Sequence, residues 1–295
     1  MKKVNKNLTL RPRNLIEGRA HYDKAIIKLG IEKCWPEKYS SIYHSDIVKT
    51  ELKKIYNGKC AFCNQTPKGS PLQVEHFRPK NGIKDEVHTG YYWLGYEWTN
   101  LLYACGNCNS TKNNHFPLLR GVARVLNPHW ISADKFDLKE SLSYSNSLKI
   151  EKYVLINPEI DNPEKHLYYE SDGKIGFLDY RGEISIKRYN LNRDELYLEG
   201  RKQLLDDLIK KMAKRLQKFT DKTRNAKDVY EDIVNIIVEE IIEPIESNGS
   251  FDHFRYTLFE NFDLYILPRF GLKKHRYLLN NIFNTLHQGL NVKLN

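Results

Sequence analysis

Apolar residues recur at helical spacing over long stretches in the C-terminal part of the chain. Residues 194–219 carry one apolar stripe, and residues 229–245 carry another, which Pro244 is expected to end. Residues 251–288 also have helical spacing and are rich in aromatic side chains, with a break near Pro268. Amphipathic helices bury one face against each other, so the pattern predicts a largely helical C-terminal region.

The N-terminal half has shorter predicted elements. After a polar, basic lead-in over residues 1–20, which is expected to pack loosely, a helix should begin at Ser45 and end at Gly58. Ser45 is a good N-cap, and Gly58 suits a left-handed C-terminal conformation. Residues 72–77 alternate in part between apolar and polar and predict a short strand. Residues 166–188 predict further strands, with turns at Asp172-Gly173 and Arg181-Gly182. The expected fold class is α+β.

Excess positive charge is confined to the first part of the chain, although the net charge of the whole is +10. Residues 1–130 contain 21 Lys and Arg against 10 Asp and Glu, whereas residues 131–295 contain 26 against 27. A basic surface attracts a polyanion and releases its counterions, so the asymmetry favours nucleic acid as a partner over a generally basic surface. We therefore expect two regions, 1–130 and 131–295, with no linker sequence between them.

Nothing in the sequence indicates a membrane or a secreted protein. No apolar run approaches the roughly 18 residues that a membrane-spanning helix needs. The lysines at the start are not followed by an apolar stretch, as a secretory signal would require. Five cysteines are an odd number, which is awkward for a disulfide scaffold. These features predict a cytoplasmic protein.

Four of the five cysteines form two Cys-x-x-Cys pairs, while Cys34 stands alone and is expected to be buried. The pairs are Cys60 with Cys63 and Cys105 with Cys108. In a reducing cytosol such pairs are metal ligands more often than redox or disulfide partners. Four thiolates complete a tetrahedral Zn²⁺ shell with no open position, so the predicted zinc would be structural. It would join the two ends of a small motif with little core of its own.

A carboxylate, a histidine and two asparagines accompany these pairs in a fixed order. Glu75-His76 lies between the pairs, Asn100 precedes the second pair, and Asn109 follows it in the run Cys-Asn-x-x-Lys. In this order the motifs resemble the HNH (ββα-metal) endonuclease family; together they are specific, whereas each alone would be weak. The resemblance implies that residues 1–130 form an HNH nuclease domain with N-terminal helices. Residues 131–295 would support it or dock a partner.

The resemblance also implies a role for each of the four residues. Phosphodiester hydrolysis needs a base to deprotonate water and a Lewis acid to neutralise charge on the phosphate and the leaving oxygen. His76 would be the base, and Glu75 a ligand of a catalytic Mg²⁺ or Mn²⁺. Asn100 would tie the connecting loop and help to orient the histidine. Asn109 stands where many members have their last histidine, and its amide oxygen is a hard ligand that suits these metals.

Four basic residues near the motif are candidate phosphate contacts. Arg78, Lys80 and Lys112 are close to the catalytic residues in sequence, and the alternative for each is a solvated surface. His115 lies six residues after Asn109 and could replace the missing histidine. A helix would place these two side chains far apart, so a phosphate contact or a surface role is favoured for His115.

Further motifs resemble those of a narrower group within the HNH endonuclease family. They are Glu-His-Phe-Arg-Pro-Lys at 75–80, the aromatic run at 91–98, Lys-Asn-Asn-His-Phe-Pro at 112–117 and Leu-Ile-Asn-Pro at 155–158. We expect core packing for the aromatic run, with base stacking as the alternative. Over residues 45–205 the chain is similar to the HNH nucleases that work with an ABC-type ATPase in Septu-like and some retron anti-phage systems. The resemblance implies an ATPase partner and cleavage of DNA, with RNA as the alternative substrate, during phage defence.

Two hypotheses of function remain. The first is a metal-dependent endonuclease, and the second is a non-catalytic zinc module that binds nucleic acid. The basic region and the cysteine pairs would serve both. Only the first needs Glu75 and His76 together with Asn100 and Asn109, since a binding module requires neither a base nor a second metal. The sequence therefore favours the endonuclease.

Overall fold

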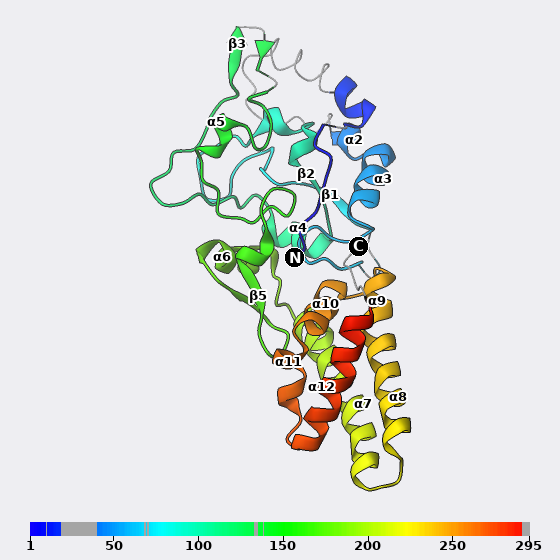
Figure 1. Cartoon of the computed structure of the whole chain (residues 1–295). Helices are drawn as coiled ribbons and strands as arrows, with labels where there is room; N and C mark the ends of the chain where they lie inside the picture. Colours follow the sequence, from blue (N-terminus) through cyan, green and yellow to red (C-terminus); the bar gives the residue numbers. More distant parts are fainter. Residues whose placement is uncertain are drawn as a thin grey trace. The chain divides into compact units, whose positions relative to one another are not determined.

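The computed structural model describes residues 1–9, 11–18, 40–67, 69, 71–132, 135–137 and 139–290, and Figure 1 traces the chain from blue to red. The chain forms two compact units. Unit 1 combines Met1–Leu167 with Phe177–Asn190, and unit 2 combines Tyr168–Gly176 with Leu191–Asn295. Cys34, expected to be buried, lies outside the described residues.

The units do not divide the chain at residue 130, where its charge changes. The segment after residue 130 belongs to unit 1 because a side chain near β1 holds it there. Arg78 donates to the carbonyl oxygens of Ser143 and Leu148 and forms an ion pair with Glu151. The charge pattern along the sequence contains no sign of these contacts.

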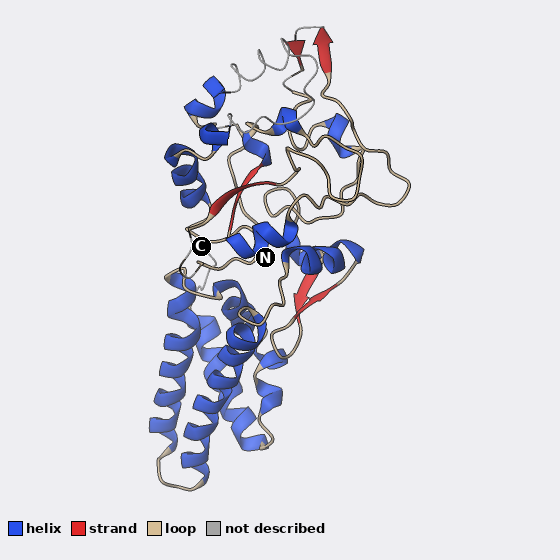
Figure 2. Cartoon of the chain, turned by 180° about the vertical axis from the view of Figure 1, so that it is seen from behind, coloured by secondary structure: helices blue, strands red, loops and turns tan. Residues whose placement is uncertain are grey.

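Unit 1 is built from short elements joined by long loops, which Figure 2 draws in tan. Its helices are α2 (Ser40–Tyr43), α3 (Asp46–Ile55), α4 (Gly106–Lys112), α5 (Asn146–Lys149) and α6 (Tyr180–Tyr189), and residues 13–18 are helical as well. Its 3-10 turns are η2 (Tyr92–Leu94), η3 (Trp98–Asn100) and η4 (Pro163–Lys165). Its antiparallel strand pairs are β1 (Gln73–His76) with β2 (Leu101–Ala104) and β3 (Trp130–Ser132) with β4 (Lys135–Phe136).

Strand β1 confirms the strand predicted over residues 72–77. It pairs with β2 so that Gln73 lies opposite Ala104 and His76 lies opposite Leu101. All of β2 is buried, which explains why its sequence is almost wholly apolar. Successive side chains of a strand point to opposite faces, so Gln73 and Glu75 share one face of β1 while His76 lies on the other.

Helix α3 confirms the helix predicted between Ser45 and Gly58. Its residues Val48 and Leu52 are buried, and Gly58 has a left-handed φ of 69°. Ser45 precedes the helix but makes no side-chain capping bond; its hydroxyl accepts a hydrogen bond of 2.5 Å from the amide of Asn14. Ser45 therefore bonds to Asn14 in the helix of residues 13–18 instead of capping α3.

The N-terminal segment is embedded in unit 1, which corrects the expectation of a loosely packed lead-in. The side chain of Lys6 is fully buried, and its ammonium donates to the carbonyl oxygens of Trp98 (2.6 Å) and Leu101 (2.5 Å). The same ammonium pairs with the buried carboxylate of Glu159 at 3.2 Å. Lys6 therefore anchors the segment inside unit 1, while Lys3 and other polar residues of the segment are exposed.

The aromatic run at 91–98 lies in the core of unit 1. Tyr91, Tyr92, Trp93, Tyr96 and Trp98 are all buried. The ring centroids of Tyr91 and Trp93 are 5.4 Å apart at an angle of 64°, a favourable edge-to-face arrangement. Core packing, the first of the two interpretations of this run, is therefore confirmed.

Helix α6 corrects the strand prediction over the second half of residues 166–188. The side chain of Asp179 caps this helix by accepting from the backbone N–H of Gly182 at 2.8 Å, so the expected turn at Arg181-Gly182 is a helix start. A Cβ on Gly182 would lie 2.2 Å from the carbonyl oxygen of His166, so the close approach of the two segments requires glycine. The cap by Asp179 favours a helix here, although the alternating apolar residues had indicated a strand.

Unit 2 is mostly helical, as predicted. Strands β5 (Leu167–Tyr169) and β6 (Ile175–Phe177) flank the predicted turn at Asp172-Gly173 and lead into this unit. The helical segments are η5 (Tyr197–Lys202, π-helical), α7 (Gln203–Thr220), α8 (Ala226–Ile237), η6 (Val238–Ile242, π-helical), α9 (Glu243–Glu246), α10 (Asp252–Glu260), α11 (Phe262–Tyr265), η7 (Leu267–Arg269) and α12 (Lys273–Gly289). Pro244 does not end its helix, because it lies in the first turn of α9, where no N–H is needed.

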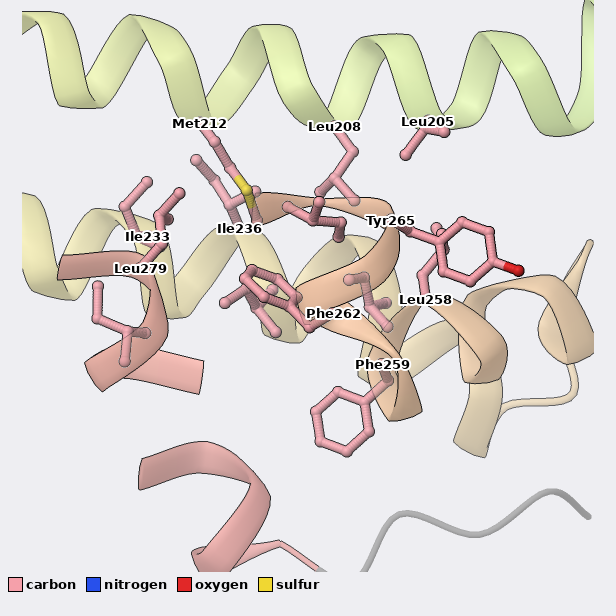
Figure 3. Packing of buried hydrophobic residues seen from close by; sticks show 14 of the residues in the cluster. Leu205, Leu208, Met212, Ile233, Ile236, Leu258, Phe259, Phe262, Tyr265 and Leu279 are labelled. Carbon is pink, nitrogen blue, oxygen red and sulfur yellow. The ribbon is translucent and has the colours of Figure 1, made fainter. Parts of the chain in front are cut away.

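The hydrophobic cluster in the core of unit 2 comes from the predicted stripes. Figure 3 shows Leu208 and Met212 of α7 directed toward Ile236 of α8 and Phe262 of α11. Each of these side chains is almost completely buried, and burying one contributes roughly 1.5–3 kcal/mol. Unit 2 therefore has a hydrophobic core of its own. None of the helices in the described ranges is both long enough and apolar enough to cross a membrane.

Replacing Lys6 with Met should destabilise unit 1 by about 3–5 kcal/mol, because the buried carboxylate of Glu159 loses its counterion. Urea unfolding followed by tryptophan fluorescence measures the loss. Lys3, which is exposed and donates only to the backbone oxygen of Glu159, provides the control: Lys3→Met should cost less than about 1 kcal/mol. Equal losses for the two variants would show that the buried ion pair is unimportant.

Candidate active site and four-cysteine cluster

The four paired cysteines come together in unit 1. All four are buried, and their sulfur atoms lie within 4.8 Å of one another. The sulfurs of Cys63 and Cys105, one from each pair, are 3.9 Å apart. Tetrahedral Zn²⁺ binds thiolates at about 2.3 Å, which places the sulfurs roughly 3.8 Å apart. The cluster therefore has the donor set and the spacing of a zinc site.

Local backbone structure presents the sulfurs to one another. In the first pair, the N–H of Cys60 donates to Gln65 O, and Asn64 adopts a left-handed φ of 57°, so the chain turns back on itself after Cys63. In the second pair, Cys105 is the N-cap of α4, and its sulfur accepts from the N–H of Cys108 at 3.5 Å. Each Cys-x-x-Cys pair thus forms a tight turn with both sulfurs on one side.

The chemistry of the cluster also favours a bound cation. Burial raises the pKa of the Cys60 thiol well above its usual range, because a lone thiolate is poorly solvated there. Zn²⁺ offsets the cost of gathering four thiolates in a buried site, and metal binding releases their protons. A cluster of this kind can hold Zn²⁺ and link residues 60–63 to the start of α4.

A cavity of about 460 Å³ opens beside β1 and α4. Strand β1 contributes Gln73, Glu75 and His76 to its wall, and α4 contributes Asn109. His44, from the turn between α2 and α3, and Lys80, from the loop after β1, also line it. The structure thus brings together three of the four residues expected to be catalytic, namely Glu75, His76 and Asn109.

His76 is held in one orientation at the end of β1. It is buried, and its Nε2 lies 2.9 Å from the carbonyl oxygen of Gly95. A carbonyl can only accept, so Nε2 carries the proton and the lone pair of the neutral ring is on Nδ1. The ring of Tyr43 packs edge-on against it, with centroids 4.7 Å apart. Burial, followed by the charge of Lys80, lowers the pKa of His76 well below its usual value, which favours the neutral ring.

Asn100 lies outside the cavity and organises the loops around His76. It is fully buried, and its side-chain oxygen accepts from the N–H of Arg78 at 2.8 Å. Its amide nitrogen donates to the carbonyl oxygens of Arg78 (3.0 Å) and Leu94 (3.3 Å). Leu94 directly precedes Gly95, whose carbonyl accepts from His76. Asn100 therefore fixes the position of the hydrogen-bond acceptor of His76 without touching the cavity.

Glu75 forms an ion pair across the gap between β1 and α4. Its Oε1 lies 2.6 Å from the ammonium of Lys112, and its side chain is only 10% exposed. Burial raises the pKa of Glu75, and the charge of Lys112 opposes that effect. Glu75 also lines the cavity, so the ion pair does not close it off.

Asn109 and Gln73 meet at the mouth of the cavity. The amide of Asn109 donates to the side-chain oxygen of Gln73 at 2.6 Å. Gln73 was not among the predicted site residues, although its position two residues before Glu75 places both on one face of β1. Carboxylate and amide oxygens are hard ligands, so Glu75, Asn109 and Gln73 form a donor set suited to Mg²⁺ or Mn²⁺.

Two of the four candidate phosphate contacts have internal roles instead. The guanidinium of Arg78 is fully buried against Glu151 and against the rings of Tyr91 and Phe116. Lys112 is fully buried as well, with its ammonium on Glu75 and on the carbonyl oxygen of His76. Neither side chain is accessible to a phosphate. Proximity to the motif in sequence did not reveal that Arg78 and Lys112 are buried, whereas Lys80 lines the cavity.

Lys80 and His115 have different surroundings. Lys80 is partly exposed, lines the cavity and lies 5.3 Å from the centroid of the Tyr43 ring. His115 is partly buried but is not part of the cavity wall, and burial lowers its pKa. His44, which carried no motif, is exposed within the cavity wall, and burial together with Lys49 and Lys80 lowers its pKa. Only the tertiary structure identifies it, because it lies far from β1 in sequence.

Replacing Cys105 with Ser should lower zinc content and thermal stability together, because the cluster loses a thiolate, whereas the serine hydroxyl can still cap α4. Elemental analysis of the purified protein measures the zinc, which is expected at about one ion per chain in the parent. Cys34→Ser, outside both pairs, is the matched control and should leave zinc content unchanged. Full zinc content in Cys105→Ser would exclude the four-thiolate site.

The chain is similar in sequence to known proteins of one system. It is 34% identical to the Septu protein PtuB of Bacillus mycoides (strain KBAB4) over 212 residues, covering 66% of this chain and 66% of PtuB. It is 32% identical to the Septu protein PtuA of the same strain over 197 residues, covering 64% of this chain but 25% of PtuA. No protein-family model and no solved structure matches the chain. The chain spans 66% of the length of PtuB, and it is similar to the Septu proteins PtuB and PtuA.

Proposed function

We propose that this protein is a metal-dependent endonuclease of the HNH type that acts in anti-phage defence. The observation that carries the proposal is the arrangement of His76. Its Nε2 is held by a backbone carbonyl, while the ring lines the same cavity as Glu75 and Asn109. A base of fixed tautomer beside a set of hard oxygen ligands is the arrangement that metal-assisted hydrolysis of a phosphodiester needs.

His76 is proposed as the general base. With Nε2 donating to Gly95 O, the neutral ring can accept a proton from water only at Nδ1. The hydrogen bonds of Asn100 to the Leu94 and Arg78 carbonyls keep this geometry fixed before substrate binds. An orienting partner behind a catalytic histidine contributes to catalysis by removing alternative orientations.

Glu75 and Asn109 are proposed as ligands of a catalytic Mg²⁺ or Mn²⁺. They come from β1 and α4 and line one cavity, and Gln73 lies beside them on the same strand face. A divalent cation bound there would neutralise charge on the phosphate and on the leaving oxygen. The sequence β1, β2, α4 is then the ββα unit of the family, with the zinc of the four cysteines as its structural metal.

Lys80 is proposed as a phosphate contact within the cavity. It is partly exposed, and His44 lies in the same wall. Lys80 gives the cavity wall a positive charge, so a phosphodiester bound there would contact both this ammonium and the proposed divalent cation. Nucleic acid is the proposed partner of unit 1, with DNA as the expected substrate and RNA as the alternative.

The kinship with PtuB and PtuA supports a place in a multi-protein defence system. We propose an ABC-type ATPase as the partner, as the sequence resemblance implies. Unit 2, with a hydrophobic core of its own, is proposed to support the nuclease or to dock that partner. The protein is proposed to act in the cytoplasm, where phage nucleic acid is accessible.

Replacing His76 with Ala should lower cleavage of supercoiled plasmid by at least about 100-fold, because the attacking water loses its base. The assay compares the parent and the variant in Mg²⁺ and in Mn²⁺, with and without the partner ATPase. His129→Ala, an exposed histidine paired only with Asp137, is the control and should cleave normally. Full activity of His76→Ala would contradict the mechanism. Binding without cleavage by the parent and its ATPase partner would favour the non-catalytic zinc module.

Binding of a DNA duplex should weaken steeply as salt rises, because phosphate contacts release counterions. Replacing Lys80 with Ala should weaken binding and reduce the slope of log K against log salt by about 1. Lys54→Ala is the control, since Lys54 is exposed on α3 and pairs with Glu51. Fluorescence anisotropy over a salt series measures both; a flat response, or equal slopes for Lys80→Ala and the parent, would exclude Lys80 as a contact.

A further inference from the structure

Lys112, at the end of α4, has an ammonium that is completely enclosed by protein. The ammonium lies 2.6 Å from Glu75 Oε1 and donates to the carbonyl oxygens of His76 (2.9 Å) and Asn113 (3.4 Å). An ammonium has three donors, so these three acceptors satisfy it fully. Lysine is almost never fully buried unless it is paired, and this one is paired with a residue of the proposed metal site.

The same ammonium contacts both reactive residues of β1. It contacts the carboxylate of Glu75 and the backbone oxygen of His76, so it binds both a side chain and the backbone at the end of β1. Asn109 lies three residues before Lys112 on α4, and residues at that spacing are neighbours on one helix face. One helix therefore carries a proposed metal ligand and the cation that holds the other ligand in place.

We propose that Lys112 is a positioning residue of the metal site, which fixes the carboxylate of Glu75 so that it can bind a divalent cation without displacing the lysine. The inference rests on the proposed function, because it concerns the metal ligands named there. A carboxylate has two oxygens, and the ion pair through Oε1 is compatible with a metal contact through the other. Glu75 lines the cavity from which a cation would enter.

The surroundings of Lys112 argue against a model in which the metal takes its place. Leaving Glu75 would require the ammonium to give up the carbonyl oxygens of His76 and Asn113 as well. The side chain is fully buried and has no solvent to move into. Moving an unpaired ammonium through such a site is costly, so the lysine is expected to stay when the metal binds.

Mn²⁺ binding to the full-length, zinc-loaded chain tests this inference directly. Electron paramagnetic resonance of free Mn²⁺ gives the Kd without any need for cleavage. Replacing Lys112 with Met, which keeps length but removes charge, should weaken Mn²⁺ binding about 10–100-fold, as is typical when a partner behind a metal ligand is lost. Lys112→Arg keeps the charge and should restore part of the affinity.

A double-mutant cycle separates positioning from a general loss of structure. In a Glu75→Gln background there is no carboxylate to orient, so adding Lys112→Met should change the Mn²⁺ Kd little further. The double variant also removes both partners of the buried pair, which folds more readily than a chain with one unpaired charge. Lys54→Met removes an exposed Lys–Glu pair of similar length, 2.7 Å, and should leave the Kd unchanged. Zinc content and circular dichroism check the fold of each variant.

The outcomes separate the inference from the function on which it rests. If the parent binds Mn²⁺ through Glu75, but Lys112→Met binds it equally well or more tightly, then Lys112 competes with the metal or is irrelevant to it. If the parent does not bind Mn²⁺, or Glu75→Gln binds it unchanged, the proposed metal site itself fails and the inference fails with it. If Lys112→Met does not fold, Lys112→Arg takes its place. Weaker Mn²⁺ binding than in the parent, with no further loss in the Glu75→Gln background, would support the inference. An unchanged Kd would contradict it.

Discussion

The gathering of four cysteine sulfurs is the constraint on which the active region depends. Residues 60–63 and 105–108 are far apart in sequence, and the cluster brings them to one point in unit 1. Because Cys105 is also the N-cap of α4, the cluster fixes where that helix begins and which way it runs. Asn109 and Lys112 then reach β1 from that helix. In a loop-rich unit with short strands, the cluster and the contacts of Lys112 and Asn109 with β1 together set this geometry.

Buried ion pairs hold the remaining loops of unit 1. Among the described residues they join Lys6 with Glu159, Arg78 with Glu151, and Lys112 with Glu75. Each joins segments that are distant in sequence, and each is surrounded by further hydrogen bonds. Burying two charges costs desolvation energy, so such pairs specify one arrangement rather than add much stability. Unit 2 differs, because its helices associate through an apolar core.

Around His76 the residues that line the cavity differ from the residue that positions the surrounding loops. His76, Glu75 and Asn109 face the cavity, whereas Asn100 acts from behind through the loop that carries Gly95. Asn100 can therefore influence the orientation of His76 without lining the cavity.

The sequence by itself determined several of the elements and the cysteine donor set. The helical stripes, the strand of residues 72–77 and both cysteine pairs are local patterns, and each is found where the spacing places it. The direction of individual cations was decided only by the tertiary structure. Arg78 and Lys80 are two residues apart, yet one is buried against Glu151 and the other lines the cavity. His44 and Gln73 line the cavity although the sequence analysis did not select them. Asp179 caps α6 in a segment that was predicted to be a strand. For the cations and His44 the physical reason is the same: burial and pairing depend on residues that are distant in the chain, so no local sequence pattern reveals them.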